Sequence, residues 1–130
     1  MSMMLTEHRR SLLVIDDDES ILRVFRRIFE KNGYVVFTAQ SGKEAEEKLE
    51  ENCFDATLFD LKLPDMNGTD LLPFMMKTDP DMVKIAITGL PESDIAVEEV
   101  KRGVDAFLSK PVKPETLLTV LETELKHRKR

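Results

Sequence analysis

Short apolar runs alternate with longer segments of helical periodicity along the whole chain. Five runs of this kind cover residues 11–16, 34–39, 54–60, 83–89 and 106–110. In the segments that follow them, apolar residues recur three, four and seven positions apart, which is the period of an amphipathic helix. Strands and helices that alternate in this way indicate repeated βαβ units with right-handed crossovers. The chain is therefore expected to be an α/β protein with a parallel sheet covered by helices on both faces.

Local signals indicate where several of the helices begin. Ser41 is expected to cap the second helix, with Glu44 completing a capping box three residues later. Prolines are expected at or near the first turns of later helices, where a missing backbone donor does least harm. These residues are Pro73 for the third helix, Pro91 with Glu92 for the fourth, and Pro114 for the fifth.

Length and composition are those of one globular domain. The chain has 130 residues, of which 42% are hydrophobic and 34% charged, and this balance argues against a disordered chain or a disulfide scaffold. A formal net charge of −6 gives no overall basic field, so we expect no direct nucleic-acid binding by this domain. The single cysteine, Cys53, is expected to be an inert, partly buried thiol. Without a signal peptide or a membrane-length apolar segment, the expected location is the cytoplasm, with no membrane association.

The two ends of the chain differ in character from the body. The domain is expected to cover residues 11–126, preceded by a tail over residues 1–10. Residues 127–130 are expected to form a basic C-terminal tail or the start of a linker. Two interpretations stay open: a stand-alone protein, or a module cut from a longer chain, the second being favoured.

Polar and charged residues follow four of the apolar runs. They are Asp16, Asp17 and Asp18 after the first run, Asp60 at the end of the third, Thr88 and Gly89 at the end of the fourth, and Ser109 and Lys110 at the end of the fifth. The carboxyl ends of parallel strands meet at one edge of the sheet, where ligands bind in sheets of this type. We therefore expect these residues to gather at a single site.

The residue types at this edge favour phosphoryl chemistry. Carboxylates gathered this closely repel one another and raise one another's pKa unless a cation neutralises them. Mg²⁺ suits such a site because it binds one or two carboxylates, a phosphate oxygen and several waters. Lys110 adds a fixed positive charge and Thr88 a hydroxyl donor. With these groups in place, the Asp60 carboxylate is a candidate nucleophile that forms an aspartyl phosphate.

Part of the acidic cluster has a simpler explanation. Aspartate and serine are favoured N-caps, and acidic residues are favoured in the first turn of a helix. Asp18, Glu19 and Ser20 are therefore expected to start the first helix.

Taken together, these motifs resemble the receiver domain of two-component response regulators over about residues 11–125. The matching stretches are "VIDDDES", "LFDLKLPDMNG" with Pro64 and Gly68, "AITG" and "DAFLSKP", and they occur in the family's order. The resemblance implies a flavodoxin-like (βα)₅ three-layer sandwich with a five-stranded parallel sheet in the order 2-1-3-4-5. It also implies a signalling domain that catalyses only its own phosphorylation and dephosphorylation, not an enzyme.

The resemblance assigns the metal and the phosphoacceptor. Asp60 is implied to be the phosphoacceptor and a ligand of Mg²⁺. Asp17 is implied to bind the metal directly, Asp16 largely through water, and Lys62 through its backbone carbonyl.

The resemblance also assigns a switch. Thr88, beside Gly89, is implied to turn its hydroxyl toward the phosphoryl group. Lys110 is implied to bind a phosphoryl oxygen, and the peptide between Lys110 and Pro111 is implied to be cis. Phe107 then turns inward, and the surface of the fourth helix, fifth strand and fifth helix changes to control a partner or an output domain. Phe107 departs from the family's usual tyrosine and has no hydroxyl, so its two positions are expected to differ mainly in packing.

The implied partners are other proteins. The phosphodonor is a histidine kinase or a histidine phosphotransfer protein. The apolar and charged residues on the face between the fourth and fifth helices have two open interpretations. They form the interface of a homodimer that assembles on phosphorylation, or they are ordinary core residues and solvated charges. We also hypothesise that the Lys62 side chain alters the rate at which the aspartyl phosphate is hydrolysed.

Three other functions were weighed against this one. A haloacid-dehalogenase-like phosphatase would use Asp16 and Asp18, but it leaves Asp60 without a role and lacks an acidic pair after Lys110. A flavodoxin-like nucleotide-binding module is disfavoured because three acids after the first run repel a phosphate in the absence of a metal. A degenerate receiver used only as a binding surface is disfavoured by the set of Asp60, Asp17, Thr88 and Lys110.

Overall fold

Strands and helices alternate through the part of the chain that the computed structural model describes, residues 9–91 and 94–128. In chain order the elements are β1 (Ser11–Ile15), α1 (Glu19–Lys31), β2 (Val35–Ala39), α2 (Gly42–Glu51), β3 (Ala56–Phe59), α3 (Gly68–Thr78), β4 (Val83–Thr88), α4 (Ile95–Lys101), β5 (Ala106–Ser109) and α5 (Pro114–His127). All strand pairs are parallel, in the order β2-β1-β3-β4-β5. The expected (βα)₅ sheet and its strand order are confirmed. No helix within the described ranges is long and apolar enough to span a bilayer.

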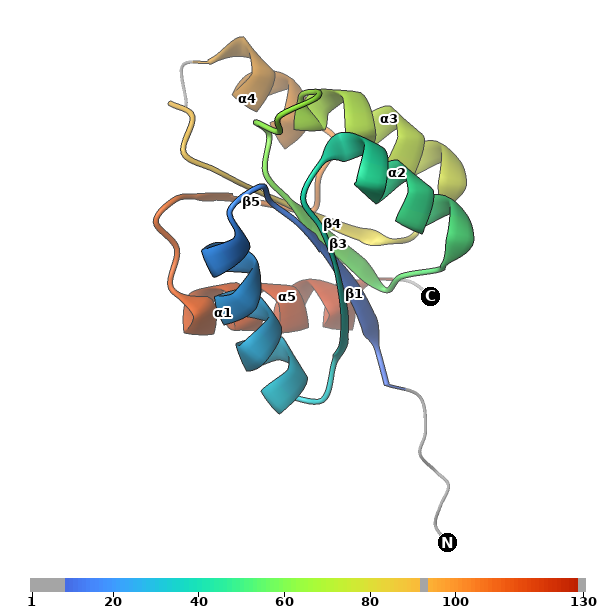
Figure 1. Cartoon of the computed structure of the whole chain (residues 1–130), viewed down its shortest axis with the longest axis vertical. Coiled ribbons are helices and arrows are strands. Elements are labelled where there is room, and N and C mark those ends of the chain that lie inside the picture. The colour runs from blue at the N-terminus through green and yellow to red at the C-terminus, as the bar shows by residue number, and fades with distance from the viewer. Residues whose placement is uncertain (1–8, 92–93, 129–130) are drawn as a thin grey trace, which may run out of the picture.

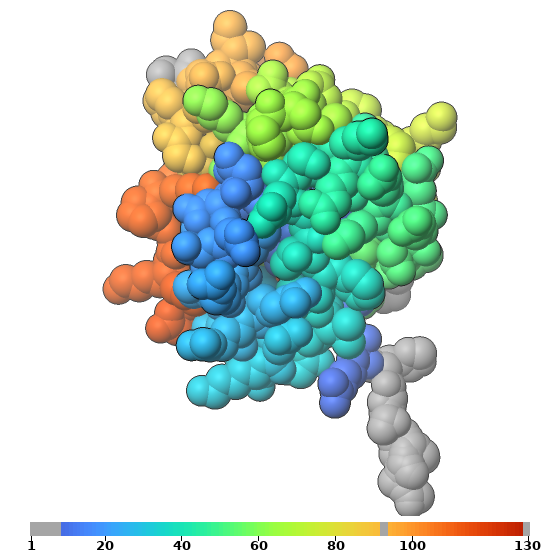
Figure 2. All heavy atoms as spheres, viewed as in Figure 1, coloured from blue at the N-terminus to red at the C-terminus, as the bar shows by residue number. Residues whose placement is uncertain are grey.

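The sheet lies between two layers of helices, with α1 and α5 on one face and α2, α3 and α4 on the other (Figure 1). Residues of β1 alternate between the two layers: Leu12 and Val14 join the α1/α5 side, whereas Leu13 and Ile15 join the α2–α4 side. A strand covered on both faces needs apolar side chains at every position, which explains the unbroken run in the sequence. At the β2 edge, side chains of α1 (blue) and α2 (teal) gather on either side of the strand (Figure 2).

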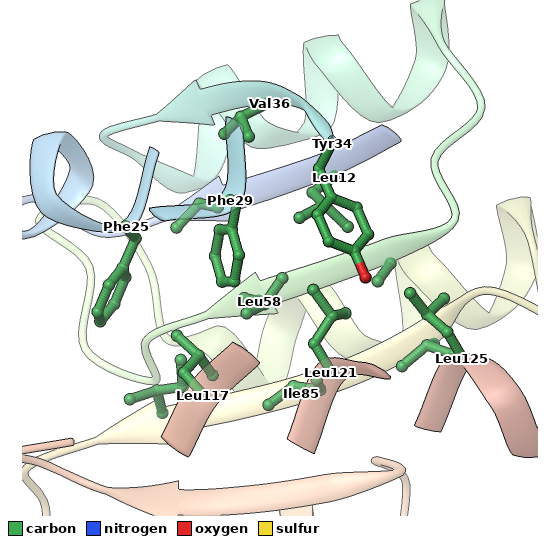
Figure 3. Close-up of a cluster of buried hydrophobic side chains, with 14 of the residues drawn as sticks. Leu12, Phe25, Phe29, Tyr34, Val36, Leu58, Ile85, Leu117, Leu121 and Leu125 are labelled. Atoms are coloured by element: carbon green, nitrogen blue, oxygen red, sulfur yellow. The ribbon is translucent and has the colours of Figure 1, made fainter. Parts of the chain in front are cut away.

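The core beneath α1 and α5 is built around aromatic rings (Figure 3). Phe29 of α1 is fully buried, and its ring centroid lies 6.1 Å from that of Tyr34 in an edge-to-face arrangement. Leu117 and Leu121 of α5, one helical turn apart, are also fully buried in this cluster. The apolar stripes of the two helices therefore meet over the central strands.

The amino edge of the sheet is tied together by Asp55. Its carboxylate accepts hydrogen bonds from the Ser11 backbone N–H at 2.7 Å and from Arg128 Nη2 at 2.6 Å. Its backbone carbonyl accepts a further bond from Arg128 Nη1 at 2.8 Å. The start of β1 and the end of α5 are thus anchored at the edge opposite the carboxyl ends of the strands.

The expected position of Pro73 in its helix and the expected start of the fourth helix are wrong. Pro73 lies inside α3, because that helix already begins at Gly68 with a capping box between Asn67 and Asp70. Pro91 precedes α4, which Asp94 caps, and Glu92 lies outside the described residues.

Two further expectations about local structure have opposite outcomes. Pro114 is the first residue of α5, as expected. Cys53 is exposed, not partly buried, because it lies in the connection after α2, where the next residue, Phe54, takes the inward position.

We expect the Phe29→Ala variant to lose about 3–5 kcal/mol in the free energy of unfolding, since the truncation leaves a cavity beneath α1. Urea unfolding followed by circular dichroism measures this loss. Val24→Ala, on the half-exposed side of the same helix, is the control and should change stability by about 0.5 kcal/mol or less. Equal losses in the two variants would contradict the described core.

Candidate functional site

Several of the polar residues at the carboxyl ends of the strands surround one open pocket of about 520 Å³, whereas Asp16, Asp18 and Ser109 do not line it. It is lined by Asp17, Asp60, Lys62, Leu63, Pro64, Thr88, Gly89, Leu90 and Lys110. The fold therefore brings together residues that follow β1, β3, β4 and β5, which are far apart in the sequence.

Lys110 joins the two buried carboxylates of this edge. Its Nζ donates hydrogen bonds to Asp60 Oδ2 at 2.7 Å and to Asp16 Oδ2 at 2.8 Å. Asp16 is 4% exposed and Asp60 is 7% exposed, so neither carboxylate is solvated well enough to stay charged at low cost without a cation. One ammonium group thus serves two carboxylates, and the group of three has a formal charge of −1 when all are ionised.

The second oxygen of each carboxylate is held by the backbone. Asp16 Oδ1 accepts a hydrogen bond from the Asp18 N–H at 2.9 Å, and Asp60 Oδ1 accepts one from the Lys62 N–H at 3.1 Å. Both side chains are therefore fixed in orientation before any ligand binds. A preset orientation of the nucleophile lowers the entropic cost of a reaction at that atom.

Burial and charge act against each other in the pair of Asp16 and Lys110. Burial raises the pKa of Asp16, and its hydrogen bond from Lys110 only partly offsets this effect. Burial also lowers the pKa of Lys110, but the hydrogen bonds to Asp16 and Asp60 outweigh it, so the pKa lies above that of an ordinary lysine. Lys110 is accordingly held in its charged form.

Thr88 and Gly89 form the part of the pocket contributed by β4. The Thr88 side chain is buried, and its Oγ1 accepts a hydrogen bond from the Leu90 N–H at 3.2 Å. Because the hydroxyl is the acceptor in this bond, its proton can be donated to another group. Gly89 is exposed at the rim, and the peptide between Lys110 and Pro111 is cis.

Two residues near this edge lie apart from the pocket. Asp18 caps α1, and its Oδ1 accepts hydrogen bonds from the N–H groups of Ser20 and Ile21, so the expectation that it starts the helix is confirmed. Phe107 of β5 is partly buried against the α2–α4 side, and Lys101 Nζ lies 5.2 Å from the centre of its ring.

The site offers hard oxygen ligands to a cation. Among the residues described, no group of three or more His, Cys, Asp or Glu side chains is arranged to hold a metal ion. Mg²⁺ needs fewer, because it keeps several waters and binds through one or two carboxylates together with phosphate oxygens. Asp60 and the exposed Asp17 line the same pocket, so the donor set fits such an ion.

The sequence patterns did not indicate how the loop after β3 is held. Leu63, Pro64 and Leu90 form walls of the pocket, and Asp65 binds the start of α2. The proline–aspartate pair in this loop is a turn signal. The carboxylate of this aspartate, however, binds Gly42 and Lys43, which lie 23 and 22 residues earlier in the chain.

Comparison with known proteins identifies similar sequences. Residues 12–122 match the model of the family described as the response regulator receiver domain. The chain is 34% identical over 123 residues to the alginate biosynthesis transcriptional regulatory protein AlgB of Pseudomonas syringae. The aligned region covers 95% of this chain and 28% of AlgB. It is 31% identical over 113 residues to the chemotaxis protein CheY of Thermotoga maritima, covering 86% of this chain and 94% of CheY. The chain thus spans less than a third of AlgB and nearly all of CheY.

Solved structures share the fold. A CheY-like receiver domain protein from Methanospirillum hungatei has a TM-score of 0.86 and 39% identity over 92% of this chain and 95% of its own. The beryllofluoride-activated NtrC4 receiver domain dimer has a TM-score of 0.81 and 36% identity, covering 89% and 96% of the two chains. A Burkholderia pseudomallei response regulator with a phosphorylated aspartic acid, calcium ion and citrate has a TM-score of 0.79 and 32% identity, covering 90% and 69%. None of these matches supports the haloacid-dehalogenase-like alternative.

We expect Lys110→Met to lower the free energy of unfolding in metal-free buffer by about 3 kcal/mol, because two buried carboxylates lose their cation. Asp60→Asn should change the free energy of unfolding by about 1 kcal/mol or less. In this variant Lys110 still pairs with Asp16, and the repulsion between the two carboxylates is removed. Urea unfolding in the presence of a chelator compares the two. A loss in Asp60→Asn as large as that in Lys110→Met would contradict this charge arrangement.

Proposed function

Because this chain belongs to the receiver domain family of two-component response regulators, we propose that it accepts a phosphoryl group on Asp60. The observation that carries the proposal is the position of this carboxylate, which lines an open pocket while Lys110 and the Lys62 N–H fix its two oxygens. A nucleophile needs access and a fixed direction, and Asp60 has both. Asp16 has only the second, because it does not line the pocket.

The proposed reaction transfers the phosphoryl group from a histidine of a partner protein. An oxygen of Asp60 forms a bond to phosphorus while the P–N bond of the phosphohistidine breaks, and the imidazole nitrogen keeps the electron pair and takes up a proton. Lys110 lies within reach of the new phosphoryl oxygens, and the Thr88 hydroxyl has a proton to donate to one of them. Catalysis of this kind rests on positioning and charge neutralisation.

The proposed cofactor is Mg²⁺. Asp17, Asp60 and the backbone carbonyl of Lys62 are the proposed direct ligands, with Asp16 acting largely through water. The bound ion supplies positive charge that neutralises the phosphoryl oxygens. The similar structure with a phosphorylated aspartic acid and a calcium ion supports a divalent cation at such a site.

The proposed output is a change on the α4–β5–α5 surface. Thr88 turns toward the phosphoryl group, and Phe107 moves into the space that it leaves. The contact between Lys101 and the Phe107 ring connects this movement to the surface, because a ring that turns inward leaves the exposed Lys101 cation of α4. The surface is proposed to control an output domain or a partner, in keeping with the greater length of AlgB, and a homodimer is proposed by likeness to the NtrC4 dimer.

The phosphodonor is proposed to be a histidine kinase or a histidine phosphotransfer protein. An apolar groove of about 470 Å³ between α1 and the start of α5 supports a protein donor, since it is lined by Val24, Pro111 and Val112 and also by Lys110. A protein seated there is next to the pocket that holds Asp60.

The remaining proposals concern the domain as a whole. It is proposed to cover residues 11–126, close to the extent of the family match. We propose that it is a cytoplasmic signalling domain that turns over no external substrate and does not bind nucleic acid directly, in line with its net charge of −6.

We expect incubation with Mg²⁺ and acetyl phosphate to add one phosphoryl group to the protein, because the small donor reaches Asp60 through the open pocket. Intact-mass spectrometry under mild acid detects the gain. Asp60→Asn and a sample treated with a chelator are the controls and should show no gain. Phosphorylation of the Asp60→Asn variant to the same extent would overturn the assignment of the acceptor.

Lys62 is exposed and lines the pocket beside Asp60, and we propose that its side chain restricts the approach of water. We expect Lys62→Ala to shorten the lifetime of the aspartyl phosphate by about 3-fold, or roughly 0.7 kcal/mol in the barrier. The decay of the phosphorylated mass after removal of acetyl phosphate measures this lifetime. Lys77→Ala, at an exposed position of α3, is the control, and an unchanged lifetime in Lys62→Ala would rule out the hypothesis.

A further inference from the structure

The loop between β3 and α3 is bound to the start of α2 by one carboxylate. Asp65 Oδ1 accepts a hydrogen bond from the Gly42 N–H at 2.8 Å, and Oδ2 accepts one from the Lys43 N–H at 2.9 Å. Figure 1 shows this loop beside the beginning of α2. These backbone hydrogen bonds hold the pKa of Asp65 below its usual value, so the contact is made by a charged carboxylate.

A second contact joins the same two segments. The Met66 side chain occupies the space next to Gly42, and a Cβ at that position would collide with it. Glycine therefore allows the loop to approach the helix this closely. Asp65 and Met66 together make a fixed attachment with both a polar and an apolar part.

Hydrogen bonds within the loop connect Asp65 and Met66 to the residues that line the pocket. Lys62 and Asn67 form an antiparallel bridge, and the Leu63 N–H donates to the Met66 carbonyl at 3.2 Å. At its end, the Gly68 N–H donates to the Leu61 carbonyl at 2.7 Å. The loop residues that line the pocket are Lys62, Leu63 and Pro64. They thus lie on one side of a hairpin whose other side is bound to α2.

We infer that Asp65 is a positioning residue of the phosphorylation site. By binding the start of α2, it holds the hairpin in the position that presents the Lys62 backbone to the pocket, and thereby sets how tightly the site binds a divalent cation. The inference rests on the proposed function, because it assigns the Lys62 carbonyl to the metal. Asp65 itself does not line the pocket.

The hydrogen bonds from Asp65 do not duplicate the N-cap of α2. Ser41 already caps this helix, and its Oγ accepts a hydrogen bond from the Glu44 N–H at 3.1 Å. Asp65 takes two other N–H groups of the first turn. Ser41→Ala therefore removes a hydrogen bond from the same helix end and leaves the attachment of the loop in place, which makes it a matched control.

The test measures Mg²⁺ binding to the unphosphorylated protein by titration of its backbone amide NMR signals. We expect Asp65→Ala to raise the Mg²⁺ dissociation constant on the order of 10-fold, as when a metal ligand loses the partner that orients it. Asp65→Asn keeps one acceptor oxygen and should fall between the wild type and Asp65→Ala. Ser41→Ala should bind Mg²⁺ like the wild type even where its melting temperature is lower.

The outcomes separate this inference from the proposed function. Equal Mg²⁺ dissociation constants in the wild type, Asp65→Ala and Asp65→Asn would overturn the inference, while phosphorylation of the wild type by acetyl phosphate would leave Asp60 as the acceptor. An equally weakened Ser41→Ala would also overturn it, because loss of helix stability would then explain the effect. A wild type that binds no Mg²⁺ overturns both the inference and the proposed cofactor. The amide spectrum of each variant reports whether it is folded. If Asp65→Ala does not fold, the Mg²⁺ dissociation constant of Asp65→Asn is compared with that of the wild type instead.

Discussion

The hydrogen bonds from one lysine to two buried carboxylates hold the functional edge of this protein together. Lys110 follows β5, whereas Asp60 follows β3 and Asp16 follows β1, so its contacts reach across β4 to Asp60 and across β4 and β3 to Asp16. Neither carboxylate is exposed enough to remain charged at low cost alone. Because two acids share one ammonium group, the site retains negative charge, which favours a cation, and has a positive group beside the proposed acceptor.

The rest of the fold supports this arrangement. Parallel strands bring the ends of β1, β3, β4 and β5 to a single edge, and two helical layers bury the strands so that the edge is the place where polar groups meet. Asp55 joins the first strand to the end of the last helix at the opposite edge. Both chain ends of the described domain are thus anchored away from the site, and the carboxyl edge is open to a donor.

The fold, and the gathering of most candidate site residues at one edge of the sheet, were predictable because each depends on a short pattern. A buried strand requires an unbroken apolar run, and an acid directly after such a run must lie at the carboxyl edge. Features that depend on distant contacts were not predictable. Nothing near Asp65 in the sequence indicates that it binds Gly42 and Lys43. The start of α3 was missed for a different reason, because the capping box of Asn67 and Asp70 is a local pattern that was not recognised.

The most direct test of the central claim is a crystal structure of the protein with Mg²⁺ and beryllofluoride, which takes the place of a phosphoryl group. The account predicts beryllium bonded to an oxygen of Asp60, with Lys110 Nζ and Thr88 Oγ1 within hydrogen-bond distance of the fluorine atoms and the metal held by Asp17. Beryllofluoride bound to another residue, or bound to Asp60 with Lys110 Nζ beyond hydrogen-bond distance of the fluorine atoms, would contradict the account.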